Sequence, residues 1–303
     1  MRVSVCVVVK DRRALMRRCL DAVLAQSPDE VVVVDNGSTD GTWEDLLERA
    51  AGESRLRVLQ DTGSLGAIRN IAVRTATCDV VAFTDSDCRP LPGWLTAGVA
   101  ALASGSDVVQ GKTVPEHEPM VRWSATQDLA GWTGLYEACN IFYRREVLLA
   151  AGGFDEQVGF FGEDTVAGWR VERIGGISMW AANAVVEHVV TTPGLGWHLR
   201  RTRGYANWPA LIKQFPEKRT LLWHGVFLRR RSAEVDLAAV GLLSAALCRR
   251  PGLMLAAVPL AWRHRPRGMS AGALLDAGSA VAFDVAISAA LLRGSVRHAT
   301  LVL

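Results

Sequence analysis

The chain has 303 residues, half of them hydrophobic, and a formal net charge of only +3 at pH 7. This length allows one large domain or one domain with an appendage, and the composition indicates a globular protein. With so small a net charge, we expect no nucleic-acid partner.

Six cysteines are scattered along the chain. They form no Cys-x-x-Cys pair and no His/Cys cluster with zinc spacing, which excludes a structural zinc site. We therefore expect free thiols and a reducing compartment, the cytoplasm. Met1 and Arg2 lead directly into an apolar run, so we expect no secretory signal before the fold.

The first 84 residues alternate between apolar runs and segments of helical spacing. The runs are rich in Val, as in strands that are buried on both faces of a parallel sheet. The expected strands are residues 3–9, 31–34, 56–59 and 80–84, and the expected helices are residues 14–26, 43–51 and 67–76. This alternation predicts an α/β fold with a mostly parallel central sheet.

Carboxylates follow the ends of three of these strands. Asp11 and Asp35 follow the first and second, and Asp85 and Asp87 follow the fourth. The carboxyl ends of parallel strands meet at one edge of a sheet, so we expect these side chains to converge there. Residues two apart on a strand face the same way, so Asp85 and Asp87 predict a site for Mg²⁺ or Mn²⁺. A turn that caps the next helix is the alternative interpretation.

The middle of the chain is less regular. Strands are expected at residues 108–111, 140–144 and 185–190, and helices at 145–151 and 165–174. Asp164 stands immediately before the second of these helices, at a position typical of an N-cap.

The chain from residue 229 onward is basic. It carries ten Arg against four acidic residues, whereas the first 228 residues carry 24 basic and 27 acidic ones. Its apolar stretches at 237–248, 251–262 and 271–292 are interrupted by charges, so none reaches the roughly 18 uncharged residues of a membrane span. We expect one domain at residues 1–225 and a basic helical region at 226–303. That region is expected to attach peripherally to the inner face of a membrane, to form a homodimer interface, or to pack on the first domain.

Two common nucleotide-binding motifs are missing. A dinucleotide fold carries G-x-G-x-x-G after its first strand, but residues 10–13 read Lys-Asp-Arg-Arg. The P-loop pattern G-x-x-x-x-G-K-[ST] does not occur either. These absences exclude NAD or FAD binding and a P-loop NTPase.

Several segments together resemble glycosyltransferase family 2, the inverting enzymes of GT-A fold. In chain order they are residues 3–9, 35–42, Gly66-Ala67-Ile68-Arg69-Asn70, Asp85-Ser86-Asp87, Asn140 with Gly152-Gly153-Phe154-Asp155, and Gly162-Glu163-Asp164 with Trp169-Arg170. The resemblance covers about residues 3–190. It implies a GT-A-like fold, followed here by the C-terminal helices. It also implies an enzyme that moves a sugar from a nucleoside diphosphate to an acceptor hydroxyl.

The resemblance further implies a role for each matching residue. Asp164 would be the general base, and Glu163 would position Asp164 or the acceptor. The divalent cation on the donor diphosphate would be held by Asp85, Asp87 and His188, although a core histidine is the alternative interpretation of His188. The nucleotide sugar would contact Val9, Asp11, Asp35, Arg69, Asp85 and Ser86. Within that set, Asp35 would bind the base, and Arg69 would lie near the diphosphate or brace Asp35.

Two other functions stay open. A nucleotidyltransferase of sugar phosphates also uses metal-binding carboxylates, but it would normally carry a Gly-rich phosphate loop after the first strand. A non-catalytic nucleotide-sugar-binding or membrane-scaffold protein would have no need of Asp85, Asp87 and Asp164 together.

Overall fold

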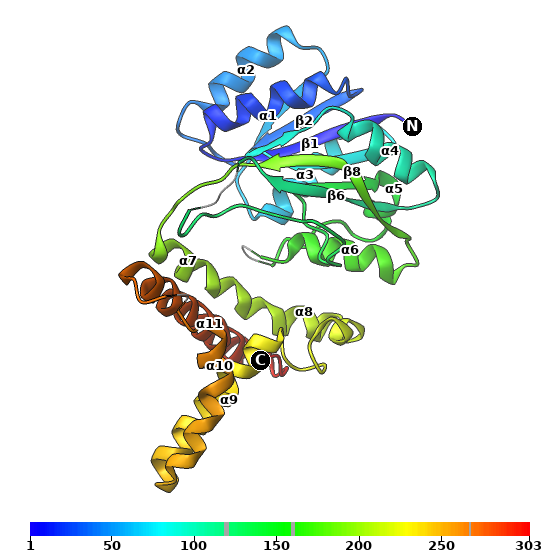
Figure 1. Cartoon of the computed structure of the whole chain (residues 1–303). Coiled ribbons are helices and arrows are strands. Elements are labelled where there is room, and N and C mark those ends of the chain that lie inside the picture. The colour runs from blue at the N-terminus through cyan, green and yellow to red at the C-terminus, as the bar shows by residue number, and fades with distance from the viewer. Residues whose placement is uncertain (118–120, 159–160, 267) are drawn as a thin grey trace. The chain divides into compact units, whose positions relative to one another are not determined.

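In the computed structural model, a mixed eight-stranded sheet forms the centre of the N-terminal part of the chain (Figure 1). The structure describes residues 1–117, 121–158, 161–266 and 268–303. The strands are β1 (Val3–Val9), β2 (Glu30–Asp35), β3 (Leu56–Gln60), β4 (Val80–Asp85), β5 (Cys88–Pro90), β6 (Val108–Pro115), β7 (Asn140–Arg144) and β8 (Ser178–His188). Their order across the sheet is β3-β2-β1-β4-β7-β6-β8-β5.

The expected parallel strands are confirmed. β1 pairs in parallel with both β2 and β4, and β2 pairs in parallel with β3. Beyond β4 the sheet becomes mixed, because β7 runs antiparallel between β4 and β6. The short strand β5 was not expected, and β8 begins at Ser178, well before the expected strand start at residue 185.

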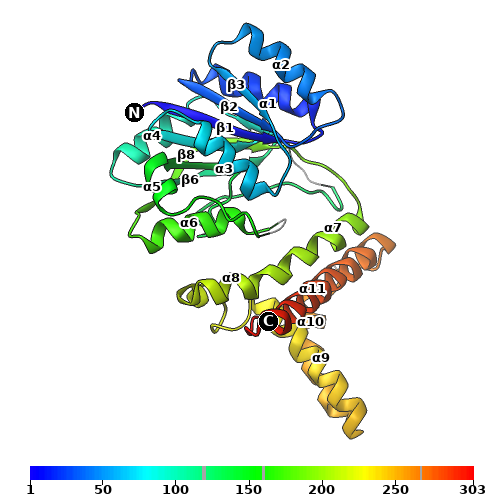
Figure 2. The same ribbon diagram turned by 180° about the vertical axis from the view of Figure 1, so that it is seen from behind.

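Helices cover both faces of this sheet. Those of the N-terminal part are α1 (Arg13–Ala25), α2 (Thr42–Gly52), α3 (Leu65–Thr75), α4 (Trp94–Ala103), α5 (Arg145–Ala150) and α6 (Glu163–Arg173). On one face, Val5 and Val7 of β1 join Leu20 of α1 and Trp94 of α4 in a buried core. On the other face, α3 packs on β1 and β2 (Figure 2). Alternate side chains of a strand point to opposite faces, so the largely apolar run of β1 is buried on both faces of the sheet.

The described chain divides into two compact units. The first consists of Met1–Met120 and Ala125–Thr191, and the second of Val121–Ser124 and Thr192–Leu303. The second unit contains α7 (Leu195–Arg201), η1 (Thr202–Asn207), α8 (Trp208–Gln214), η2 (Pro216–Leu221), α9 (Arg230–Cys248), η3 (Pro251–Ala257), α10 (Val258–Arg263) and α11 (Ala271–His298). It is helical throughout the elements described, as expected for the C-terminal region. The boundary expected near residue 225 lies inside this unit and stays a prediction.

Within the described residues, one helix is long and apolar enough to cross a membrane by length and composition. It is α11, whose most apolar 18-residue window has a mean hydropathy of 1.6 and is 33% buried. From the sequence we expected no membrane span, because only stretches without any charged residue were counted. Helix α11 contains two carboxylates, Asp276 and Asp284, and therefore did not qualify. The two carboxylates of α11 are paired, Asp276 with Arg122 and Asp284 with His264 and Arg231.

Candidate active site

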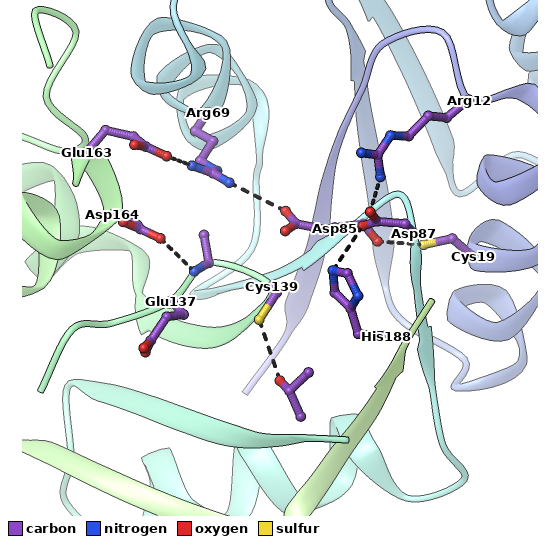
Figure 3. A network of polar contacts seen from close by, with 12 residues as sticks. Arg12, Cys19, Arg69, Asp85, Asp87, Glu137, Cys139, Glu163, Asp164 and His188 are labelled. Atoms are coloured by element: carbon purple, nitrogen blue, oxygen red, sulfur yellow. Dashed lines mark hydrogen bonds and ion pairs between the residues drawn. The ribbon is translucent and has the colours of Figure 1, made fainter. Parts of the chain in front are cut away.

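The carboxyl end of β4 brings a carboxylate and an imidazole together. Asp87 lies in the turn between β4 and β5, and Cys88 of β5 pairs with His188 at the end of β8. This pairing sets His188 Nε2 3.7 Å from Asp87 Oδ1 (Figure 3). The side-chain donor atoms of Asp87, Cys88 and His188 all lie within 4.8 Å of one another.

The hydrogen bonds of His188 assign its tautomer. Its Nδ1 lies 2.9 Å from the carbonyl oxygen of Val189 and 3.2 Å from Thr126 Oγ1. A carbonyl oxygen only accepts, so Nδ1 carries a proton, and Nε2 is the ring nitrogen that faces Asp87. A fixed Nδ1–H is the usual arrangement of a histidine that binds a metal through Nε2.

This donor set fits a hard divalent cation. Burial raises the pKa of the Cys88 thiol well above its usual value, and nearby thiols and carboxylates add to the effect. Cys88 therefore stays a neutral thiol, and the donors that remain are the Asp87 carboxylate and His188 Nε2. A carboxylate and an imidazole, completed by phosphate oxygens and water, suit Mn²⁺ or Mg²⁺. Asp85 lies outside this trio.

Arg12 forms an ion pair with the other carboxylate oxygen of Asp87. Its Nη1 donates to Asp87 Oδ2, and it comes from the loop between β1 and α1. In the sequence, Arg12 stands only as one of the residues that replace a Gly-rich loop after the first strand. No local pattern links it to Asp87, because the two meet through the pairing of β1 with β4.

Arg69 joins the two halves of the site (Figure 3). This buried side chain of α3 donates through Nη1 to Glu163 Oε1 and lies 3.4 Å through Nη2 from Asp85 Oδ1. Burial acts to lower the pKa of Arg69, but the charges of Glu163, Asp85 and Asp164 outweigh it and raise that pKa. The expected alternative contact with Asp35 is not formed, because Arg69 extends toward α6.

Asp164 stands in the first turn of α6. Its Oδ2 accepts from the backbone N–H of Ala138 at 3.1 Å, and its Oδ1 accepts from the N–H of Thr165 at 2.8 Å. Burial, followed by the charge of Glu163, raises the pKa of Asp164 to about 7. The opposing charge of Arg69 is smaller in effect. A carboxyl that titrates near neutral pH is suited to accept a proton.

The interpretation of Asp164 as an N-cap is wrong. Helix α6 begins at Glu163, and its N-cap is Gly162 with φ 108°. Glycine adopts this left-handed conformation without the steric cost that a Cβ would bring, so the helix starts before Asp164. Glu163 is 3% exposed, and its carboxylate is held in a buried ion pair with Arg69.

The loop that presents Ala138 to Asp164 is held by close packing. A Cβ on Gly168 of α6 would lie 1.9 Å from the ring of Tyr136, so the ring lies directly on the helix backbone. The hydroxyl of Thr133 donates to the carboxylate of Glu137 beside it, with Oγ1 3.0 Å from Oε1 and 2.8 Å from Oε2. Burial raises the pKa of Glu137. The sequence analysis missed Glu137 and Ala138 because nothing in the local pattern marks them.

The ends of β1 and β2 form a second polar cluster. Asp35 is fully buried, and its Oδ2 accepts from Ser38 N–H at 3.0 Å and from Gln60 Nε2 at 2.9 Å. Asp11 Oδ1 accepts from Thr39 N–H at 2.7 Å. Both carboxylates therefore hold the loop of residues 36–42. The remaining two predicted residues lie nearby: Val9 is buried in the core opposite Asp35, and Ser86 is buried in the turn after β4.

Two glycines and an asparagine lock α3 to the segment before α6. Asn70 accepts from Phe154 N–H and donates to Phe154 O, both at 2.9 Å. A Cβ on Gly66 would lie 2.1 Å from the carbonyl oxygen of Asp155, and one on Gly153 would lie 2.5 Å from Asn70 Oδ1. These contacts explain why Gly66, Asn70 and Gly153 occur together in the motif set.

Comparison with known proteins agrees with this geometry. The family model described as glycosyl transferase family 2 matches residues 4–154. An uncharacterized glycosyltransferase, Mb0553 of Mycobacterium bovis, is 32% identical over 171 residues, which are 51% of this chain and 77% of that protein. The chain belongs to glycosyl transferase family 2.

Another relative in sequence is glycosyltransferase AglE of Haloferax volcanii. It is 30% identical over 168 residues, 50% of this chain and 55% of AglE, so the chain spans about half the length of that relative. Among solved structures, the mannosyltransferase PcManGT from Pyrobaculum calidifontis, in complex with GDP-Man and Mn²⁺, has a TM-score of 0.61 and 21% identity. The match covers 98% of this chain and 87% of that chain, and it confirms the GT-A-like fold.

Proposed function

We propose that the chain transfers a sugar from a nucleoside-diphosphate sugar to an acceptor hydroxyl, with inversion at the anomeric carbon. The observation that carries this proposal is the pair of chemically different centres that Arg69 bridges. Asp87 and His188, which would hold a cation, lie on one side, and Asp164, with its pKa near 7, lies on the other. Membership of the family supports the same reaction.

The acceptor half of the reaction belongs to Asp164. Its ionised carboxylate takes the proton of the acceptor hydroxyl while that oxygen attacks the anomeric carbon. The bond from the anomeric carbon to the diphosphate oxygen breaks at the opposite face, and the diphosphate leaves with the electron pair. The hydrogen bonds from Ala138 and Thr165 hold the carboxylate in place for this transfer.

The donor half belongs to the end of β4. Asp87 and His188 would hold Mn²⁺ or Mg²⁺, with Asp85 near its ligand waters or the ribose. Such a cation stabilises the negative charge that grows on the leaving diphosphate. PcManGT was solved with GDP-Man and Mn²⁺, which supports a nucleotide-sugar donor and a divalent cation for this chain as well. Asp11 and Asp35 would position the 36–42 loop around the nucleotide.

Arg69 and Glu163 act as positioning residues in this scheme. The Arg69 guanidinium holds Asp85 on the donor side and Glu163 on the acceptor side. The Glu163 charge keeps the pKa of Asp164 high, and Arg69 moderates that effect. The ion pair therefore sets both the geometry and the basicity of the site.

The test is a panel of nucleotide sugars with Mn²⁺, scored by release of nucleoside diphosphate and by the anomeric configuration of the product. Asp164→Asn should lower kcat by roughly 10²–10⁴, as expected when a general base is lost. Binding of nucleoside diphosphate, measured by calorimetry, should stay unchanged. Asp21→Asn, which changes an exposed carboxylate on α1, is the matched control and should leave both quantities unchanged.

Three results would contradict the proposal. Full turnover by the Asp164→Asn variant would remove the base assignment. Release of pyrophosphate from a nucleoside triphosphate would indicate a nucleotidyltransferase. Nucleotide-sugar binding without turnover, across a broad acceptor panel, would indicate a binding or scaffold protein.

A further inference from the structure

Two antiparallel arms in the second unit form a helical hairpin whose outer surface is apolar. We call residues 230–265 the apolar hairpin: α9 is its first arm, and η3 with α10 is its second (Figures 1 and 2). The arms meet along small residues. A Cβ on Gly241 would lie 2.4 Å from Ala256 Cβ and 2.7 Å from the carbonyl oxygen of Leu253.

The outward side chains are large, apolar and exposed. On the first arm, Leu243 is 64% exposed and Leu247 is 83% exposed. On the second arm, Leu255 is 72% exposed and Trp262 is 67% exposed. A contiguous apolar surface of this kind marks an interaction site rather than ordinary surface composition.

The exposed apolar surface extends around most of each arm. On α9, Val240 and Leu242 are both exposed, and residues two apart on an α-helix point about 200° away from each other. Within residues 237–248, the buried side of α9 is the narrow strip of Ala238, Gly241 and Ala245, and Gly241 packs against the second arm. A folded partner covers one side of a helix, whereas an arm at the boundary of a bilayer meets acyl chains below and at its flanks and headgroups above, so this distribution favours lipid.

The charges of the hairpin lie at its ends. Each arm has twelve uncharged residues, 237–248 and 251–262. Arg249 and Arg250 form the turn, and Arg263 and Arg265 close the second arm. Glu234 pairs with Arg230 and Arg263. Across the described residues no carboxylate pairs with the two turn arginines, so they are available to an anionic partner.

Trp262 lies at the same end as Arg263 and Arg265. The guanidinium of Arg265 lies 4.2 Å from the centre of the Trp262 ring. Tryptophan and arginine together are typical of the boundary between lipid headgroups and acyl chains. An apolar middle with arginine and tryptophan at its ends therefore matches the layers of a lipid surface.

We propose that the apolar hairpin binds the surface of a bilayer that contains anionic lipids, with both arms lying at the boundary between headgroups and acyl chains. The twelve uncharged residues of the first arm span about 18 Å, which is short of the roughly 30 Å hydrocarbon core. Arg249 and Arg250 at the turn would be costly to bury in the middle of that core. The hairpin therefore lies along the surface and does not cross the membrane.

Cys248 provides a direct probe. It is exposed at the turn of the hairpin, whereas the other five cysteines are buried. The full chain would be labelled there with an environment-sensitive thiol dye and titrated with phosphatidylcholine vesicles with and without phosphatidylglycerol. The expected result is a blue shift and a gain in intensity with phosphatidylglycerol vesicles, and quenching by lipids that carry a shallow quencher.

Paired variants test which residues bind. Leu243→Ser/Leu247→Ser should weaken vesicle binding by about tenfold or more, because it removes two exposed apolar side chains. Arg249→Gln/Arg250→Gln should weaken binding to anionic vesicles only. The control is Leu47→Ser/Leu149→Ser, which changes two leucines of the first unit that are 46% and 40% exposed, and it should bind as the unchanged chain does. Thermal melts establish that each variant is folded.

Three outcomes would overturn the proposal. One is the absence of any vesicle-dependent change in a folded, labelled chain. Another is a blue shift that rises with protein concentration without vesicles, together with a dimer in light scattering, which would assign the surface to a second copy of the chain. The third is equal affinity for neutral and anionic vesicles, which would remove the role of the arginines.

Discussion

At the scale of single residues, the site contains two carboxylates, Asp87 and Asp164, in different surroundings. Asp87 has His188 at one carboxylate oxygen and Arg12 at the other. Asp164 lies half-buried beside Glu163, which favours its neutral form. In the proposed mechanism, one carboxylate would bind a metal and the other would accept a proton.

The raised pKa of Asp164 predicts an effect on stability. Its folded-state pKa of about 7 lies well above the ordinary pKa of an aspartate side chain, about 3.9. Between these values the folded chain binds more protons than the unfolded chain, so the free energy of unfolding falls as pH rises toward 7. Asp164→Asn removes this penalty. The variant should melt above the unchanged chain at pH 8.5, and the difference should shrink at pH 5.

Differential scanning fluorimetry across this pH range measures the effect. Asp21→Asn is again the control, because that carboxylate is exposed. A gain in melting temperature that is the same at both pH values would contradict the titration of Asp164. The same group predicts that kcat/KM rises with pH along an acid limb near pH 7.

Arg12 predicts a competition with the cation. Its guanidinium occupies Asp87 Oδ2 in the structure, so it must move for that oxygen to bind metal. Exposed ion pairs of this kind are worth roughly 0.2–1 kcal/mol, so Arg12→Gln should tighten Mn²⁺ binding by up to about fivefold without nucleotide. Binding of nucleoside diphosphate should weaken, because a cation beside the phosphates is lost.

Calorimetry with Mn²⁺ alone, and then with nucleoside diphosphate, separates these two effects. Arg18→Gln is the matched control, since Arg18 lies on α1 and pairs with Glu116 instead. Weaker Mn²⁺ binding in the Arg12→Gln variant would show that Arg12 supports the metal site and does not compete for it.

At the scale of elements, the site depends on how α3 meets the chain that leads into α6. Arg69 and Asn70 of α3 contact Glu163 and Phe154, so the helix fixes both ends of that segment. The link requires close approach of backbones at Gly66. Any side chain there would push α3 away and move Arg69 with it.

Gly66→Ala should therefore destabilise the fold. The added Cβ would lie 2.1 Å from the carbonyl oxygen of Asp155, and overpacking of this kind costs about 1–3 kcal/mol. Gly52→Ala is the control, because nothing lies within 4 Å of its Cβ position at the end of α2. Urea unfolding measures both variants. Equal stability of the two would indicate that the α3 contact relaxes without cost.

At the scale of the whole molecule, the sequence predicted the parallel half of the sheet and less of the antiparallel half. Buried parallel strands read as runs of Val, and their ends directly locate Asp35 and Asp85. By contrast, β5 has only three residues, and it is a strand because it pairs with β8. Local patterns do not encode such a pairing.

The residues of the candidate site stay a prediction from the motif set, and the contacts that connect them were not predicted. The motif set identified Asp85, Asp87, Asp164, Glu163 and Arg69. The partners Thr126, Arg12 and Ala138 escaped notice, because each reaches the site through tertiary contacts of the chain. The N-cap of α6 was predicted at Asp164 but lies at Gly162. In the sequence, a glycine that caps a helix with a positive φ cannot be told from a glycine in a loop.

The strands β5 and β8 pair although they are far apart in the sequence, and this separation affects how the chain folds. Arg89 and Glu187 face each other across these strands although they are 98 residues apart in sequence. Closing so long a loop is entropically costly and slows the formation of contacts that depend on it. During synthesis, β1 to β4 are complete before His188 emerges. We therefore expect the contact between Asp87 and His188, the proposed cation ligands, to be among the last to form, after β1 to β4 have assembled.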